Sequence, residues 1–215
     1  MVKKTRSARI SQAAIFAAAA EEFAERGFDA AGVDRIASRA RVNKAMLYYH
    51  FGSKRELYLD LVRDMVRTVG SRARGIADGA GSAEDKLDAW IAAIVEEAAA
   101  RPWFASIMLR EVAEGGAHLD RATLAELSAV PQAFGEVIAA GIRSGALRAV
   151  HPMAAYFTIL APIIFYLASA PIRDELAEAR LLKLSPLPAD VFITHLRDTM
   201  RRALVVDAGK PARST

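Results

Sequence analysis

The chain of 215 residues carries 29 Lys and Arg against 25 Asp and Glu, and it contains no cysteine. This length suffices for one large domain or two small ones, each able to bury a hydrophobic core. The lack of cysteine excludes disulfides, zinc–cysteine sites and thiol nucleophiles, and it fits the reducing cytoplasm, where we expect the protein to reside.

The charge is distributed unevenly along the chain. Residues 1–75 hold 15 Lys and Arg against 8 Asp and Glu, whereas the remainder is slightly acidic. This pattern is typical of a polyanion-binding head joined to a nearly neutral body, although a solvated basic tail would also explain it. We expect residues 1–10 to form a basic N-terminal arm that either contacts DNA or is disordered. The cations of this arm are Lys3, Lys4, Arg6 and Arg9.

The first part of the chain predicts three helices in close succession. An Ala-rich composition and apolar residues at helical spacing predict an all-α fold. A helix over 11–26 ends at Gly27, which suits a left-handed C-terminal cap. A short second helix covers 33–40, and Asn43 is placed to cap a third short helix over 44–50.

Longer helices follow. Ser53 and Glu56 have the spacing of a capping box and open a fourth helix that runs to about residue 74. The Gly-rich segment GIADGAGSAED, residues 75–85, is the best candidate boundary, and Ser82 within it is placed to cap the next helix. The further helices are expected at 83–100, 102–115, 119–144 with a break at Pro131, 152–170, 172–182 and 189–206.

Residues 153–170 form an apolar segment without charge that is about long enough to span a membrane. Pro162 lies in its middle, and no second span or flanking basic cluster accompanies it. We therefore favour a helix buried in a protein core and expect no membrane association.

The two short helices and the brief turn at residues 41–42 have the geometry of a helix-turn-helix. In this motif one helix lies in the DNA major groove and the preceding helix braces it. Lys44 would reach a base edge or a phosphate, Tyr48, Tyr49 and His50 suit phosphate oxygens, and Lys54 suits a phosphate at the start of the fourth helix. Half-buried aromatic residues and ordinary solvated lysines are the alternative.

Two stretches resemble the TetR/AcrR family of bacterial transcriptional regulators. They are AAEEFAERGFDAAGV, residues 19–33, and IASRARVNKAMLYYHFGSKREL, residues 36–57. Three positions depart from the family pattern. Arg41 stands where the turn commonly has glycine, Gly32 replaces the usual Thr cap, and Met46 stands where small or hydroxyl residues are frequent and is expected to alter base preference.

The resemblance implies an N-terminal three-helix helix-turn-helix DNA-binding domain over 11–57 and a larger helical ligand-binding and dimerisation domain over 58–206. Residues 207–215 are expected to be a disordered tail. The implied protein is a homodimeric repressor that a small, mainly apolar effector releases from a palindromic double-stranded DNA operator. The candidate DNA contacts are Asn43, Lys44, Met46, Tyr48, Tyr49, His50 and Lys54.

In the second half, the family pattern implies a helical effector cavity and a dimer face formed by about 153–170 and 189–206. The predicted ligand-binding residues are Trp90, Ile94, Trp103, Phe104, Met108, Phe134 and Phe157, although such aromatic residues also form ordinary cores. The apolar residues predicted for the dimer face are Phe157, Ile164, Leu167, Phe192, Leu196 and Met200.

Sequence motifs give no support to an enzyme. The chain has no GxGxxG, GxxxxGK[ST], HExxH or GxSxG motif. His118 and His151 lie in predicted loops without metal-ligand spacing around them, so we expect no metal and no cofactor. A helical interaction module whose helix-turn-helix binds protein remains the alternative to a DNA-binding regulator.

Overall fold

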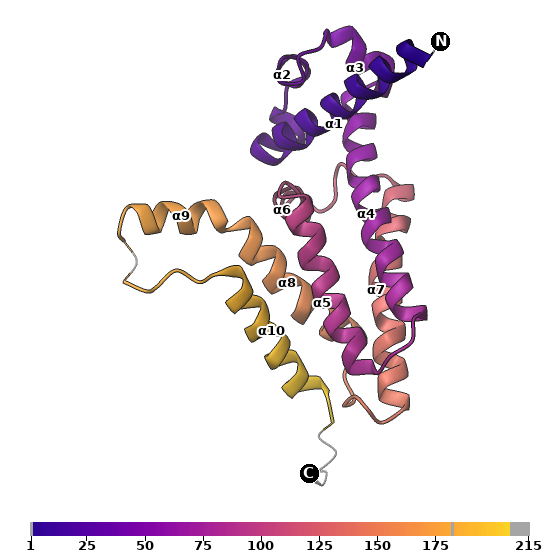
Figure 1. The fold of residues 1–215 in the computed structure, drawn as a ribbon, viewed down its shortest axis with the longest axis vertical. Coiled ribbons are helices and arrows are strands. Elements are labelled where there is room, and N and C mark those ends of the chain that lie inside the picture. The colour runs from indigo at the N-terminus through magenta and orange to yellow at the C-terminus, as the bar shows by residue number, and fades with distance from the viewer. Residues whose placement is uncertain (1, 182, 207–215) are drawn as a thin grey trace. The chain divides into compact units, whose positions relative to one another are not determined.

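The computed structural model describes residues 2–181 and 183–206 (Figure 1). The described residues form helices and one isolated bridge between Leu147 and Val205, which confirms the predicted all-α fold. The helices are α1 (Val2–Ala30), α2 (Val33–Arg39), α3 (Lys44–Phe51), α4 (Lys54–Asp78), α5 (Ala83–Ala100), α6 (Phe104–Ala113), α7 (Arg121–Arg143), α8 (Pro152–Ala168), α9 (Ala170–Glu178) and α10 (Ala189–Leu204).

The helix boundaries follow from local capping chemistry at several points. Gly27 has a φ of 74°, which produces a kink inside α1 where the sequence predicts a left-handed cap. The Asn43 side chain accepts a hydrogen bond from the Ala45 N–H, and the Ser53 hydroxyl accepts one from the Glu56 N–H. These contacts satisfy N–H groups that have no partner within the first turn of a helix.

The helices pack into two compact units. The first contains the residues up to Thr68 together with Ala98–Leu127. Its core joins residues from α1, α2, α3, α4 and α6, and Phe23, Leu47 and Leu57 are completely buried there. Burial of such large apolar side chains stabilises the unit by about 1.5–3 kcal/mol each. The short helices α2 and α3 are therefore held by tertiary packing.

The second unit contains Val69–Glu97 together with the residues from Ser128 onward. Trp90, Phe134 and Tyr156 form an aromatic group at its core, with ring centroids 5.3–6.4 Å apart. Helix α7 approaches the start of α5 at Gly141, where an added Cβ would lie 2.9 Å from the Ala83 Cβ. Only glycine fits this crossing without a shift of the neighbouring backbone.

Two sequence predictions about helix ends are wrong. Helix α7 continues through Pro131 without the predicted break. Proline removes one backbone hydrogen bond, but Val130, Ala133 and Phe134 beside it are buried in the core, and their burial offsets that loss. The helix predicted to start at residue 11 begins earlier, at Val2, within the residues predicted as an arm, whose DNA contacts stay a prediction.

Helix α8 is buried on one side only. Ala155, Ile159 and Ile163 are buried, whereas Phe157 and Phe165 are 57% and 68% exposed. No single described helix is long and apolar enough to cross a membrane. Taken together, α8 and α9 pass the length and composition test, but they are bent by 47° relative to each other.

The predicted functional domains over 11–57 and 58–206 stay predictions, because packing into compact units does not test functional boundaries. The predicted tail over 207–215 lies outside the described residues.

Candidate nucleic-acid interface

The turn between α2 and α3 is closed by backbone hydrogen bonds. Val42 N–H donates to the Ala37 carbonyl at 3.0 Å, and Arg41 N–H donates to the Ser38 carbonyl at 3.1 Å. Arg41 has a φ of 55°, which a side chain other than glycine adopts at an energetic cost. Arg41, which stands where the family commonly has glycine, therefore adopts the turn conformation, but its backbone is strained.

Helix α3 presents two different faces. Leu47 and Phe51 are buried and anchor the helix in the core of the first unit. On the opposite side Tyr48 is 45% exposed and Tyr49 is 78% exposed. Large aromatic side chains are usually buried, so two adjacent exposed tyrosines on a firmly anchored helix indicate a contact surface.

Lys44, at the first position of α3, is exposed and paired with an acidic neighbour. Its amino group lies 2.8 Å from one carboxylate oxygen of Asp34 and 3.0 Å from the other. The hydrogen bond to Asp34 raises the pKa of Lys44, so the amino group stays protonated. A phosphate or base acceptor would have to replace Asp34 at this cation.

The polar atoms of Asn43 and His50 and the side chain of Met46 are engaged within the protein. Asn43 is exposed, but its side-chain oxygen caps α3. Met46 is partly buried and packs against the core of the first unit. The His50 Nε2 atom lies 3.0 Å from the Ser11 hydroxyl of α1. Their predicted DNA contacts stay predictions.

Lys54 is engaged within the protein. Its amino group donates to the carbonyls of Phe28, Asp29 and Ala31 at 2.7, 3.3 and 3.1 Å. It also lies 4.5 Å from the centroid of the Phe28 ring. A lysine has three N–H donors, and all three carbonyls lie at the end of α1. A phosphate contact at Lys54, as predicted, would require these bonds to be exchanged.

Two arginines that the sequence reading did not select are better placed to meet phosphate. Arg41 in the turn and Arg55 in the first turn of α4 are both exposed. Among the described residues, neither forms a hydrogen bond or an ion pair. Their guanidinium groups are therefore available to a polyanion. The sequence could have indicated them, because Arg41 lies two residues before Asn43 and Arg55 directly follows Lys54.

A buried carboxylate positions α2 against α1. Glu22 of α1 is fully buried and accepts hydrogen bonds from Arg35 Nε at 2.5 Å and from the Gly32 N–H at 3.2 Å. Burial alone would raise the pKa of Glu22, but the hydrogen bonds from Arg35 and Gly32 and the charges of Arg35 and Arg26 lower it overall. The carboxylate of Glu22 therefore stays charged and holds the start of α2 in place against α1.

The predicted ligand-binding residues fall into two hydrophobic cores. Trp90, Ile94 and Phe134 are buried in the core of the second unit. Trp103, Phe104 and Met108 pack against the core of the first unit. Phe157 is exposed on α8. Assignment of all seven residues to one effector site stays a prediction.

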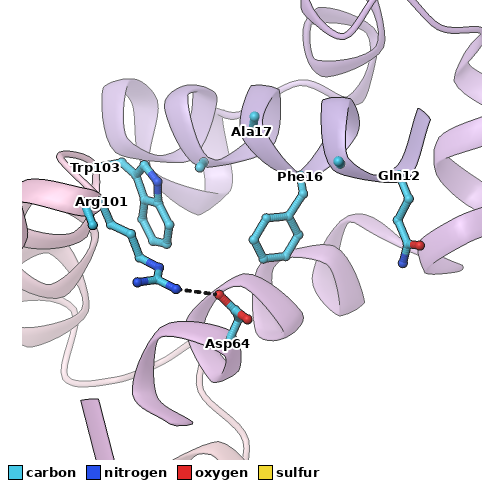
Figure 2. A pocket seen from close by; sticks show the side chains of 9 residues that line it. Gln12, Phe16, Ala17, Asp64, Arg101 and Trp103 are labelled. Carbon is cyan, nitrogen blue, oxygen red and sulfur yellow. Dashed lines mark hydrogen bonds and ion pairs between the residues drawn. The ribbon is translucent and has the colours of Figure 1, made fainter. Parts of the chain in front are cut away.

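A surface pocket of about 650 Å³ lies in the first unit (Figure 2). Phe16 and Ala17 of α1 and Trp103 supply apolar walls, and Arg101 and Asp64 lie at one edge with 3.2 Å between Nη2 and Oδ2. Of the seven predicted ligand contacts, only Trp103 lines this pocket.

Helices α8 and α10, which were predicted to form the dimer face, do not expose all of the apolar residues that the sequence predicted for that face. Ile164, Leu196 and Met200 are buried in their own chain, so their predicted place at the dimer face is wrong. The error arises because every residue of α8 is uncharged, and composition alone cannot tell which face meets the core. Exposed residues recur at every fourth position of α8, at Met153, Phe157, Ala161 and Phe165.

Two family descriptions match the chain. Residues 7–61 match the family described as bacterial regulatory proteins, tetR family. Residues 84–185 match the family described as tetracyclin repressor-like, C-terminal domain. Together the two matched segments cover more than half of the chain.

Individual proteins show the same likeness. The chain is 27% identical over 198 residues to the HTH-type transcriptional repressor SCO4008 of Streptomyces coelicolor, which covers 92% of this chain and 95% of that protein. It is 51% identical over 57 residues to the HTH-type transcriptional activator FasR of Mycolicibacterium smegmatis, a match that spans 26% of each chain. The solved structure of the ketosteroid transcriptional regulator KstR2 of Mycobacterium tuberculosis shares the fold, with a TM-score of 0.71 at 22% identity over 90% of this chain and 94% of that chain.

Proposed function

Because the chain belongs to the TetR family of bacterial regulatory proteins and is a ligand-responsive DNA-binding transcriptional regulator, we propose that it is a homodimeric repressor of a palindromic operator. The observation that carries this proposal is the exposed face of α3, where Lys44, Tyr48 and Tyr49 stand on a helix anchored by Leu47 and Phe51. Two such helices related by a two-fold axis would enter successive major grooves about 34 Å apart.

The exposed side chains of α3 divide into two roles. The ammonium group of Lys44 attracts phosphate or a guanine edge, the Tyr48 hydroxyl can donate to a phosphate oxygen, and the Tyr49 ring can contact a thymine methyl group. Arg41 and Arg55 flank this face and add charge that does not depend on sequence. Base reading is thus assigned to α3, and general affinity to the surrounding cations.

The proposed dimer uses the exposed stripe of α8 and the adjacent face of α10. Phe157 and Phe165 offer apolar surface without hydrogen-bonding groups, and Val191 on α10 is 50% exposed. Burial of such a stripe against its symmetry mate would remove this surface from water. Such a regulator works where the chromosome lies, so we place it in the cytoplasm.

The proposed effector site is the aromatic group of the second unit. The Trp90 Nε1–H donor is buried without a hydrogen-bond partner in the described part of the chain. A buried donor without a partner costs about 1–3 kcal/mol, which an acceptor on a ligand would recover. The supported effector is therefore a mainly apolar molecule with one hydrogen-bond acceptor that reaches Trp90 between Phe134 and Tyr156.

Selection from a pool of random DNA duplexes tests the DNA-binding proposal. The wild type should enrich an inverted repeat, and the Lys44→Ala/Tyr49→Ala variant should enrich none. The interaction-module alternative, which the named relatives do not favour, predicts no enrichment by either protein. That result at low and moderate salt would refute the repressor assignment.

Tryptophan fluorescence tests the effector site. The chain has two tryptophans, so the Trp103→Phe variant reports Trp90 alone. Fatty acids and apolar ketones provide a first panel of ligands. A bound effector should change Trp90 emission and lower operator affinity. A ligand that releases DNA without any change in Trp90 emission would show that the effector binds at another site.

A further inference from the structure

Three side chains with metal-ligating atoms converge where α6 ends. Glu111 lies in the last turn of α6, Glu114 follows directly after it, and His118 lies in the turn beyond. The His118 Nδ1 atom is 3.1 Å from Glu111 Oε1 and 3.1 Å from Glu114 Oε2. One ligand atom from each of the three residues lies within 4.8 Å of the others.

The buried member of this cluster has an unsatisfied oxygen. Glu111 is only 2% exposed, and its Oε1 accepts a hydrogen bond from the Tyr58 hydroxyl. Its Oε2 is buried and has no hydrogen-bond partner among the described residues. A buried carboxylate with an unpartnered oxygen is costly, so this atom points to a missing cation or donor.

The surroundings supply too little positive charge for the two carboxylates. The Nδ1 atom of His118 can carry one proton, and both carboxylates compete for it. On its other side His118 Nε2 lies 3.7 Å from Asp29 Oδ1, which adds a further negative group. Of the cations nearby, Arg110 donates to the Glu25 carbonyl, and Lys54 donates to carbonyls at the end of α1.

We propose that Glu111, Glu114 and His118 bind a divalent transition-metal cation, for which Zn²⁺ is the natural probe. One imidazole nitrogen with two carboxylate oxygens is a ligand set that suits Zn²⁺ and its first-row neighbours. Donor atoms at about 2.0–2.2 Å from a tetrahedral ion stand roughly 3.3–3.5 Å apart. The two distances of 3.1 Å in this cluster are close to that separation.

The neighbouring groups support the ligands, and one of the ligands is exposed. Burial, together with the hydrogen bond to Glu111 and its charge, raises the pKa of Tyr58, so its hydroxyl stays a donor that orients the carboxylate. The Glu114 side chain is 41% exposed, whereas that of His118 is 11% exposed. Glu114 is therefore the member of the cluster that an ion from solvent would meet first.

The sequence prediction missed this site because it placed His118 in a loop beyond the helix stop at Gly115 and Gly116. Gly115 and Gly116 have φ values of 67° and 74°, and the Gly116 N–H donates to the Glu111 carbonyl at 2.7 Å. These two left-handed residues end α6 and fold the chain back over its last turn. His118 is thereby returned to Glu111. The three residues stand at positions i, i+3 and i+7, which is the spacing of one helix face, although α6 itself ends before the two glycines.

The cluster is connected to the end of α1, close to the DNA-binding helices. The His118 ring lies 4.6 Å from the Phe28 ring, and Phe28 in turn lies under the Lys54 amino group. Ion binding at His118 would fix this ring and the chain leading into α2. The regulatory consequence, a change in operator affinity with metal, rests on the proposed function, whereas metal binding itself does not.

Competition with a chromophoric chelator tests the site on metal-stripped full-length protein. The wild type should bind one equivalent of Zn²⁺, and His118→Ala should bind it about tenfold more weakly or worse. His151→Ala, which changes an exposed histidine outside the cluster, is the matched control and should retain wild-type affinity. Glu114→Gln serves as a second variant, because it keeps the shape of a side chain that is 41% exposed and removes only its charge.

Equal Zn²⁺ affinity in the wild type, His118→Ala and Glu114→Gln proteins would overturn the proposal, and so would the absence of binding. Operator affinity is then measured with and without Zn²⁺ on the same proteins. If the repressor assignment fails, no protein binds DNA specifically, yet the chelator titration still reports the metal site. An effect of Zn²⁺ on DNA binding that disappears in Glu114→Gln would support both the metal site and the proposed function.

Discussion

Helices α3 and α8 both expose aromatic side chains, but of different chemical kinds. Tyr48 and Tyr49 of α3 end in hydroxyl groups, whereas Phe157 and Phe165 of α8 have none. A hydroxyl can bond phosphate or water, so the α3 face suits a hydrated and charged partner. The α8 face gains only from burial, which suits a second apolar surface. Exposure thus reveals a contact surface, and the polar atoms on it reveal the class of partner.

The largest expected effect comes from a change to the α8 face. Phe157→Glu with Phe165→Glu should dissociate the dimer proposed through α8, because charge cannot be buried at an apolar contact. Operator affinity should fall by about 100-fold or more, since one half-site then binds alone. Sedimentation and fluorescence anisotropy measure the two effects. Val112→Glu, at a residue that is exposed in the first unit, is the matched control and should remain dimeric. If the double variant stayed dimeric, the exposed face of α8 would not be the dimer interface, and the contrast drawn between α3 and α8 would fail.

The next effect concerns the support of α2 by Glu22. Because the pKa of Glu22 is lowered in the folded state, its contribution to the free energy of unfolding is present above the ordinary Glu pKa of about 4.3 and is lost as the pH falls through the folded value. We expect about 2 kcal/mol from the hydrogen bonds to this charged group. Urea unfolding between pH 3 and 7 should show this loss in the wild type and not in Glu22→Gln. Parallel pH profiles of the two proteins would disprove the role of Glu22.

Lys54 and Arg55 should behave differently although they are adjacent. Lys54→Met removes the bonds to three carbonyls and should lower the free energy of unfolding by about 1–2 kcal/mol. Arg55→Ala should leave stability unchanged and reduce the slope of log affinity against log salt by about one. Denaturation and DNA titrations at several salt concentrations measure both. Arg55→Ala with a normal salt slope would remove this arginine from the DNA surface.

The smallest expected effect lies at the turn before α3. Arg41→Gly should raise the free energy of unfolding by about 0.5–1 kcal/mol, because glycine adopts the left-handed conformation without strain. DNA affinity should fall slightly at the same time, because one exposed cation is lost. Ser38→Gly, at an exposed position within regular α2, is the control and should destabilise the protein. A destabilised Arg41→Gly protein would show that the turn carries no strain.

Local signals in the sequence predicted the helix-turn-helix well. Asn43, Ser53 and Ser82 cap the helices they were expected to cap, because each bond joins groups within three residues of one another. The exposed character of Tyr48 and Tyr49 followed from the buried neighbours Leu47 and Phe51 at helical spacing.

Features that depend on tertiary packing could not be predicted in the same way. The continuity of α7 at Pro131 depends on the core that surrounds it, and the exposed stripe of α8 depends on which face the rest of the second unit covers. Lys54 was assigned to phosphate because its acceptors, 23 to 26 residues earlier in the chain, come near only after folding. His118 joins Glu111 through a glycine turn.

The central claim is that the exposed face of α3 binds the operator and that the ring of Tyr49 on this face reads a base. The most direct measurement compares the affinity of Tyr49→Ala for the selected operator with its affinity for unrelated duplex DNA at one salt concentration. We predict that operator affinity falls about tenfold while affinity for unrelated DNA stays the same, since Tyr49 is 78% exposed and its loss leaves the fold intact. An equal loss for both DNAs, or no loss for either, would contradict this claim.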